Sequence, residues 1–375
     1  MGLMSPDVIV VGAGAIGASI AYQLSKAGVK VMVFDRGPIA GEATGASGGI
    51  ISARPGPDTP EPLGILFQES ARLYPALAAE LYERTGIDIG LRRSGLLRVA
   101  YSETEEHDLR AGRHWQIDHG AVMPWLDQRS AIDVEPALNP SIRAALHDPD
   151  VQQVIPRVFA QASARAAADL GATLREGVTV FQLLLERDRV VGVGLGSETI
   201  RADEVVVANG AWAGGWSQQL HAAIPVRPVR GQMASLQTVN TALRVIVMSQ
   251  DGYALSKADG STIVGTTVED AGYDSRPTTV GVARLLMLAP RLAPRLADAT
   301  FRTAWAGLRP ATPDGRPMIG RLPDWRGVTL ATGHFRDGIL LAPITAELVT
   351  DLLLSRRPRT ALDAFDPARF VVRAA

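Results

Sequence analysis

Cysteine is absent from this chain of 375 residues. Its absence excludes disulfides, thiolate nucleophiles, zinc sites with cysteine ligands and iron–sulfur clusters. It also excludes a cofactor tethered through a cysteine sulfur. The six histidines show no HExxH or comparable ligand spacing, so we expect no metal site.

An excess of charge and a long apolar run are missing as well. The formal net charge is -1 and no run of Lys and Arg stands out, which argues against a nucleic-acid partner. No apolar segment approaches the roughly 18 residues that cross a bilayer, and the first expected strand begins too early to follow a signal peptide. We therefore expect a soluble, cytoplasmic protein without a membrane partner, and its length and 46% apolar content predict two domains.

Glycines near the start of the chain separate a β-branched run from a helical pattern. Residues 8–11 predict a parallel strand buried on both faces, and residues 15–27 predict a helix. Between them Gly12 makes the tight turn, Gly14 lets the backbone approach a pyrophosphate, and Gly17 lets the helix pack on the strand. The N-terminal amides of this helix are then directed at the phosphates of a dinucleotide.

An acidic residue closes the next strand, as this type of binding unit requires. Residues 30–34 predict that strand and Asp35 follows it, about twenty residues beyond the glycines. A carboxylate at this position accepts hydrogen bonds from both ribose hydroxyls and repels a 2′-phosphate. The pattern therefore favours FAD or NAD over NADP.

The remaining pattern predicts an α/β fold whose nucleotide-binding domain is interrupted twice. A Gly-rich segment over 41–51 is suited to lie against a flat ligand. The periodicity predicts helices over 62–84, 103–119, 156–170, 279–292 and 339–354, and strands over 95–100, 173–174, 178–185, 204–209, 226–236, 244–247, 252–256, 261–267 and 328–333, with a β-hairpin over 190–201. We assign residues 1–88, 150–224 and 301–375 to a Rossmann-type dinucleotide-binding domain, and residues 89–149 and 225–300 to an α+β substrate-binding domain that contains an antiparallel sheet.

Two C-terminal segments, WAGLRPATPDGRP at 305–317 and GHFRDGILLAP at 333–343, closely resemble the motifs of glycine oxidases. Glycine oxidases belong to the D-amino acid oxidase and sarcosine oxidase superfamily. The likeness extends over nearly the whole chain and includes residues 12–17, 46–49, 205–212 and 252–253. It implies the same fold, with FAD as the cofactor, held without a covalent bond because cysteine is absent.

The resemblance also implies which residues lie along FAD, with Val180 near the adenine and residues 334–340 against the isoalloxazine. The expected cofactor residues are Gly12, Gly14, Ala15, Ile16, Gly17, Asp35, Arg36, Thr44, Ser47, Gly48, Gly49, Ile50, Val180, Asn209, Gly210, Trp212, Gly307, Arg309, His334, Phe335, Arg336, Asp337, Gly338, Ile339 and Leu340. The helix that begins near Ile339 is expected to direct its amides at the N1 and C2 carbonyl region of the flavin.

By the same resemblance Tyr253, Arg309 and Arg336 surround the substrate. A guanidinium is a planar, permanently charged partner for a substrate carboxylate, which makes Arg309 the first candidate. Tyr253 can donate a further hydrogen bond to that carboxylate, and Arg336 is a second clamp or a gate. The alternatives are that Arg309 pairs with a structural carboxylate, that Tyr253 is part of the core, and that Arg336 caps a loop.

The expected reaction is oxidation of the glycine moiety of glycine or of an N-substituted, N-carboxymethyl-type glycine. Hydride passes from the substrate Cα to flavin N5, the imine hydrolyses to glyoxylate and an amine, and reoxidation by O2 gives hydrogen peroxide. Such a reaction needs positioning and a neutral amine more than a dedicated acid–base residue. Asp251, Gly252 and Asp337 depart from the residues common in glycine oxidases, which leaves the exact substrate open.

Three alternatives remain at the level of the sequence. One is a D-amino acid or imino acid dehydrogenase that passes electrons to another acceptor, and another is a non-catalytic flavin-binding subunit. A plain NAD dehydrogenase is disfavoured because nothing resembles a nicotinamide site with a catalytic histidine or lysine. A homo-oligomer is possible, since relatives differ in assembly.

Overall fold

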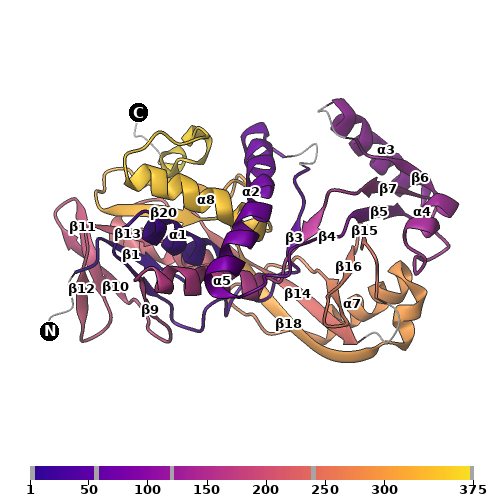
Figure 1. Cartoon of the computed structure of the whole chain (residues 1–375), viewed down its shortest axis with the longest axis horizontal. Helices are drawn as coiled ribbons and strands as arrows, with labels where there is room; N and C mark the ends of the chain where they lie inside the picture. The colour runs from indigo at the N-terminus through magenta and orange to yellow at the C-terminus, as the bar shows by residue number, and fades with distance from the viewer. Residues whose placement is uncertain (1–4, 55–58, 119–121, 238–241, 372–375) are drawn as a thin grey trace.

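The computed structural model describes residues 5–54, 59–118, 122–237 and 242–371. Figure 1 shows an elongated molecule with a helix-covered sheet at one end and a second, larger sheet toward the other. Two long strands, β14 (Arg227–Gln237) and β18 (Thr300–Ala311), extend from the middle of the molecule into the second sheet. Both sheets therefore border the middle of the molecule.

The first sheet has six strands in the order β19-β20-β13-β1-β2-β9. Five of them run parallel and β19 is antiparallel at one edge. Their bounds are β1 (Val8–Val11), β2 (Val31–Phe34), β9 (Thr173–Arg175), β13 (Glu204–Val207), β19 (Met318–Arg321) and β20 (Val328–Thr332). This order and direction give the Rossmann-type arrangement that the N-terminal glycines predict.

The central strand β1 is buried on both faces, as its unbroken apolar run predicts. Val8 and Val10 pack with one layer of helices, whereas Ile9 and Val11 pack with a small antiparallel sheet on the opposite face. The helices are α1 (Ala15–Lys26), α2 (Glu61–Thr85), α5 (Pro156–Asp169) and α8 (Gly338–Leu353), and the small sheet consists of β10 (Gln182–Glu186), β11 (Arg189–Gly194) and β12 (Thr199–Arg201). The expected hairpin over 190–201 is present as β11 and β12.

The second sheet has eight strands in the order β18-β14-β17-β16-β15-β5-β7-β6. Beyond the two long strands it contains β5 (Leu96–Ala100), β6 (Trp125–Asp127), β7 (Ala144–Asp148), β15 (Ile246–Ser249), β16 (Gly252–Ser256) and β17 (Ser261–Gly265). On one face Leu97 and Val99 pack with Leu285 and Leu288 of α7 (Thr279–Leu292). Because side chains alternate along a strand, the neighbours of these residues face the opposite side, toward the first sheet.

Shorter elements complete the second part of the molecule. They are the helices α3 (Glu103–Asp118) and α4 (Gln128–Val134), and a small sheet of β3 (Ile50–Ile51), β8 (Gln152–Gln153) and β4 (Arg92–Arg93). In this small sheet β8 pairs with both β3 and β4. It therefore ties the Gly-rich segment near residue 50 to the second lobe.

Two segments that line the cavity differ from the sequence-based expectation. The strand expected over 178–185 begins only at Gln182, because residues 178–181 run along the cavity described below. The strand β18 was not expected, since Gly307 and Pro310 weaken a strand pattern. It tolerates both because it is an edge strand, paired only with β14 in the order of the sheet.

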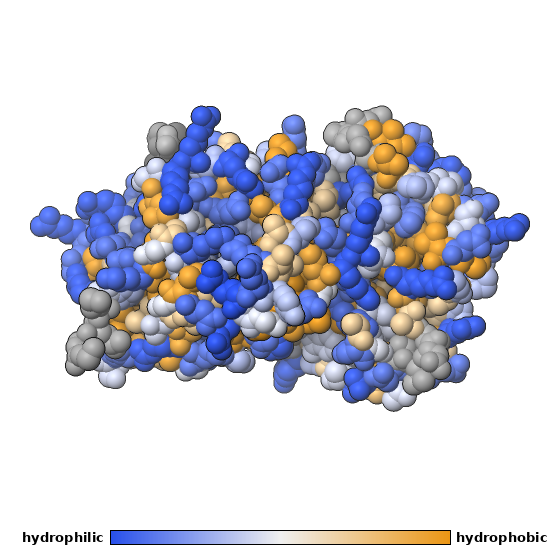
Figure 2. All heavy atoms as spheres, in the orientation of Figure 1, coloured by the Kyte–Doolittle hydropathy of each residue, from blue (hydrophilic) through white to orange (hydrophobic). Residues whose placement is uncertain are grey.

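No helix in the described part of the chain is long and apolar enough to span a membrane. On the face drawn in Figure 2, hydrophobic residues form small groups between hydrophilic ones.

Candidate active site

A cavity of about 1160 Å³ lies between the two sheets. It begins at the carboxyl ends of β1, β2 and β13, at Gly12, Asp35 and Ala208, and it extends to Arg98, Tyr253 and Arg309 of the second sheet. Ligands of open α/β sheets bind at this end of the parallel strands. The volume exceeds the roughly 300–1,000 Å³ of clefts for drug-sized ligands, so it can hold a dinucleotide and a small substrate together.

The turn after β1 is built as the glycine spacing predicts. Gly12 has a φ of 107°, and a Cβ there would stand 2.5 Å from the Ala208 carbonyl oxygen. A Cβ on Gly17 would fall 1.9 Å from the Gly12 carbonyl oxygen. Gly17 therefore lets α1 pack closely on β1, and it does not line the cavity although it was expected along the cofactor.

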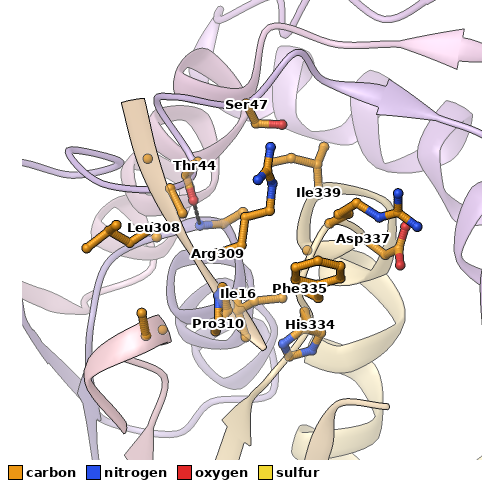
Figure 3. A pocket seen from close by; sticks show the side chains of 18 of the residues that line it. Ile16, Thr44, Ser47, Leu308, Arg309, Pro310, His334, Phe335, Asp337 and Ile339 are labelled. Atoms are coloured by element: carbon orange, nitrogen blue, oxygen red, sulfur yellow. Dashed lines mark hydrogen bonds between the residues drawn. The ribbon is translucent and has the colours of Figure 1, made fainter. Parts of the chain in front are cut away.

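The N-terminus of α1 opens into the cavity, with Gly14 at the N-cap. Thr44 Oγ1 accepts a hydrogen bond from the Ala15 amide at 2.9 Å (Figure 3). The carboxylate of Asp35 accepts hydrogen bonds from the amides of Ala13 and Gly37, at 2.6 and 2.9 Å. These bonds hold the acidic side chain and the helix terminus in fixed positions on the wall of the cavity.

Several features fit this part of the cavity to FAD. The side-chain oxygen of Asn209 and the indole nitrogen of Trp216 are buried without a hydrogen-bond partner among the described residues, and both residues line the cavity. Buried polar atoms of this kind normally have a partner. Nearby, the Arg36 guanidinium stacks 3.7 Å from the centre of the Trp212 ring. Unpaired polar atoms, a stacking pair and a helix N-terminus are the donor set and surfaces that a dinucleotide needs.

Arg309 reaches into the cavity from β18 (Figure 3). Its guanidinium lies over Gly231 of the neighbouring strand, where a Cβ would stand 2.0 Å from one nitrogen. It donates hydrogen bonds to the Thr266 hydroxyl at 2.6 Å and the Thr267 carbonyl at 3.2 Å. No carboxylate of the described residues lies within ion-pair distance of it, so the structural ion pair considered as an alternative is not found there.

Tyr253 stands on β16 beside the Gly-rich segment. A Cβ on Gly48 would fall 2.6 Å from its hydroxyl, so only glycine leaves room for the ring. The hydroxyl donates to Met233 Sδ at 3.7 Å, a weak acceptor that leaves it free for a better one. Burial raises the pKa of Tyr253 to about 12, while the charge of Arg309 lowers it, so the hydroxyl stays protonated as a hydrogen-bond donor.

Arg336 and Phe335 form the turn that precedes α8. Phe335 has a φ of 47°, in the left-handed region that a bulky residue rarely adopts, and its amide donates to the Pro310 carbonyl at 2.8 Å. The Arg336 side chain is exposed toward the cavity and lies 5.4 Å from the centre of the Phe335 ring. Figure 3 shows Phe335 and Ile339 across the cavity from Arg309.

The amino end of α8 brings two titratable groups to the cavity. Asp337 is the N-cap residue, and burial raises the pKa of its carboxyl to about 6, against the lowering effect of Arg336. His334 is buried and contacts the Thr345 hydroxyl at 3.0 Å, and burial lowers its pKa to about 3. The imidazole is therefore neutral at ordinary pH and does not supply a charge.

With the exception of Gly17, every residue expected at the cofactor or the substrate lines this one cavity. The structure thus brings together residues from stretches that lie far apart along the chain. Sequence reasoning missed Arg98, the only charged residue in the apolar strand β5, which was the signal that could have revealed it. In the described part of the chain no group of three potential metal ligands occurs.

Sequence reasoning also missed Lys257, which follows β16. Its ammonium donates to the carbonyls of Gly48 and Val154 and to Gln153 Oε1, at 2.8, 2.9 and 3.0 Å. Burial lowers the pKa of Lys257 to about 7, with Arg92 lowering it further and Asp259 raising it. Lys257 therefore ties the Gly-rich segment to the second lobe.

Comparison with known proteins agrees with this geometry. Residues 7–352 match the family described as FAD dependent oxidoreductase. The glycine oxidase of Geobacillus kaustophilus is 37% identical over 361 residues, which cover 95% of this chain and 94% of that protein. Its crystal structure superposes with a TM-score of 0.92, covering 98% of this chain and 99% of the other. The crystal structure of iminodiacetate oxidase from Chelativorans sp. BNC1 is 29% identical, with a TM-score of 0.89 and coverage of 96% and 98%.

Proposed function

The chain belongs to the FAD dependent oxidoreductase family and is an amine-oxidising enzyme, and from this premise we propose that it oxidises the glycine moiety of glycine or of an N-substituted glycine. The observation that carries the proposal is the pair formed by Arg309 and Tyr253. Both have side chains with weak or neutral partners, and both face the cavity next to the Gly-rich segment. Such a pair suits the carboxylate of a small amino acid.

The proposed roles follow from the contacts. Arg309 binds the substrate carboxylate through its planar guanidinium, and Tyr253 donates a further hydrogen bond to it, because its raised pKa keeps the hydroxyl protonated. Held by its anionic end, the substrate presents its Cα to the cavity wall formed by residues 334–340. When bound, FAD accepts the hydride that leaves this Cα, and the resulting imine hydrolyses to glyoxylate and an amine.

We propose that FAD is held without a covalent bond, by the residues of the cavity wall. The amide end of α1 and Gly14 would bind the pyrophosphate, Asp35 would bind the ribose, and the amide end of α8 would stabilise the negative charge that the flavin gains on reduction. We also retain as proposals the division into a FAD-binding part (1–88, 150–224 and 301–375) and a substrate-binding part (89–149 and 225–300). In the structure β18 joins these two parts through its pairing with β14.

Three properties of the enzyme in the cell belong to the same proposal. They are reoxidation by O2, a cytoplasmic location and the possible formation of homo-oligomers. The two relatives named above as oxidases support the first of them. Oxygen uptake with release of hydrogen peroxide during turnover is the expected result, whereas turnover that requires an added electron acceptor would make the enzyme a dehydrogenase.

Anaerobic mixing of the yellow holoenzyme with a panel of amines tests the proposed substrate. The panel contains glycine, N-alkylglycines, N-carboxymethylglycine, D-alanine and L-proline. We expect the visible absorption band of the flavin to bleach with the glycine derivatives, and glyoxylate to accumulate in air. Bleaching by D-alanine or L-proline alone would overturn the substrate assignment, and no bleaching at all would indicate a flavin-binding subunit without turnover.

A further inference from the structure

Arg98 is placed where a charged side chain is not needed for folding. On β5, Leu97 and Val99 belong to the buried cluster that also contains Leu285 and Leu288 of α7, so Arg98 lies on the opposite face of the sheet, where it lines the cavity. The two strands beside it contribute Met248 of β15 and Leu146 of β7 in direct register. A partly buried arginine between apolar neighbours needs a polar or charged partner elsewhere to offset the loss of its hydration.

The protein itself offers this guanidinium a poor partner. Its hydrogen bond goes to Met248 Sδ, 3.2 Å away, and a thioether is a weak acceptor. The acid that influences it, Asp148, forms an ion pair with Arg54 at 3.2 Å. Across the residues that the structure describes, no carboxylate lies within ion-pair distance of Arg98.

Other positive charges surround the same space. Burial lowers the pKa of Arg98, Asp148 raises it and the charge of Arg336 lowers it. Burial also lowers the pKa of Arg309, Tyr253 raises it, Arg336 again lowers it, and Glu269 raises it. Arg98, Arg309 and Arg336 all line the same cavity. Like charges gathered in a partly buried cavity repel one another, and an anion placed between them removes that cost.

The spacing of the strands sets the distance between Arg98 and Tyr253, which belongs to the site proposed for the glycine carboxylate. Tyr253, Met248 and Arg98 stand opposite one another on β16, β15 and β5, in one row across the sheet. Neighbouring strands are about 4.8 Å apart, so two steps separate the backbones of Tyr253 and Arg98 by about 10 Å. Side chains that lean into the cavity shorten this span, and two carboxylates separated by one secondary amine are roughly 5 Å apart.

From this arrangement we propose that Arg98 forms a second anion subsite that selects N-substituted glycines whose N-substituent ends in a carboxylate. The glycine carboxylate binds at Arg309 and Tyr253, and the distal carboxylate binds at Arg98. This assignment rests on the proposed function and deepens it. It makes Arg98 a specificity-determining residue and leaves the reaction at the substrate Cα unchanged.

The test compares two substrates that differ in a single charge, N-carboxymethylglycine and its monoamide, N-(carbamoylmethyl)glycine. In the wild-type holoenzyme we expect kcat/KM for the dianion to exceed that for the amide by roughly tenfold to a hundredfold, as a charge-assisted pair allows. In Arg98→Met the ratio should fall to near one, and Arg98→Lys should restore part of it. Arg110→Met is the matched control, since Arg110 is an arginine of the same lobe that pairs with Glu106, and it should keep the wild-type ratio.

Two results would overturn the subsite. One is a wild-type ratio near one, and the other is a ratio that Arg98→Met leaves unchanged. Binding of thiodiacetate, in which sulfur replaces the oxidisable amine, can be measured without turnover. The affinity for thiodiacetate relative to that for its monoamide should fall in Arg98→Met, as the ratio of kcat/KM values does. Failure of the proposed function is distinct: no glycine derivative would then bleach the flavin, while the thiodiacetate measurement would still decide on the subsite.

Discussion

Arg309 has a buried charge whose protein partners are neutral oxygens, and this makes it sensitive to the substrate. In Arg309→Leu we expect KM for the substrate to rise by about ten- to a hundredfold, because a charge-assisted hydrogen bond is worth about 1.5–3 kcal/mol. Bound FAD should be retained. Steady-state kinetics and the ratio of flavin to protein absorbance check the two parts, and a parallel loss of flavin would make Arg309 a structural residue.

Tyr253 should have a smaller effect, since it supplies one hydrogen bond and no charge. Tyr253→Phe removes only the hydroxyl, whose present acceptor is the sulfur of Met233. We expect kcat/KM to fall by about tenfold, equivalent to about 1.4 kcal/mol. The thermal midpoint of the apoprotein should hardly move, and a change of many degrees without a kinetic effect would assign Tyr253 to the core.

Asp337 predicts a pH dependence of stability in the protein without FAD. Burial raises the pKa of its carboxyl from 3.8 to about 6, so between these values the folded state binds more protons than the unfolded state. The stability from this group is present at low pH and is lost as pH rises through about 6. Asp337→Asn cannot ionise, so relative to the wild type it should gain stability between pH 4 and pH 8, by up to about 3 kcal/mol.

Urea unfolding of the wild-type and Asp337→Asn apoproteins at pH 4, 6 and 8 measures the difference between their free energies of unfolding. At pH 4 the variant and the wild type should have nearly equal free energies of unfolding, because Asp337 is then protonated in the folded state. A difference that does not change with pH would mean that Asp337 titrates near its ordinary value.

At the scale of elements, the packing of α1 on β1 decides whether the helix terminus reaches a phosphate. Gly17→Ala places a Cβ 1.9 Å from the Gly12 carbonyl oxygen, which is backbone and cannot turn aside. We expect the variant to lose about 1–3 kcal/mol of stability and to bind FAD more weakly, because α1 must move away from the turn.

Gly112→Ala is the matched control for that change. Gly112 also lies in a helix, α3, but a Cβ there meets no atom within 4 Å. Alanine should stabilise this helix by up to about 1 kcal/mol and leave FAD binding unchanged. Calorimetry and fluorescence titration with FAD compare the two variants, and equal effects at both positions would contradict the packing argument.

The bounds of the helices and strands also show how much of the fold the local sequence pattern predicts. The helices over 61–85 and 279–292 and the strands over 227–237 and 252–256 lie within about one residue of their predicted bounds. Each helix buries an apolar stripe, and each strand contains a run of buried residues. Strand β18 escaped prediction because its Gly307 and Pro310 are tolerated only through its position at the edge of the sheet. That position is not a property of the segment itself.

At the scale of the whole molecule, the cavity between the two sheets links folding to the cofactor. A ligand that binds only the folded state stabilises it by about 2.7 kcal/mol at a hundred times its Kd. We therefore expect the thermal midpoint to rise with added FAD, and denaturation followed by filtration to release all flavin, because the chain has no cysteine. Flavin that stays with the denatured protein would contradict non-covalent binding.

The sequence by itself determined the dinucleotide-binding turn and the class of cofactor, and it predicted Tyr253, Arg309 and Arg336 as substrate residues, because each depends on neighbours close along the chain or on motifs read as a unit. Only the tertiary structure decided that Arg98 faces the cavity and has a sulfur for its partner, that Gly17 of α1 packs against Gly12 and does not line the cavity, and that Lys257 holds the Gly-rich segment. These facts depend on which strands lie next to each other across gaps of about 150 to 200 residues, as between Arg98 and Met248 or between Gly48 and Lys257. Local propensity and periodicity carry no information about such pairings.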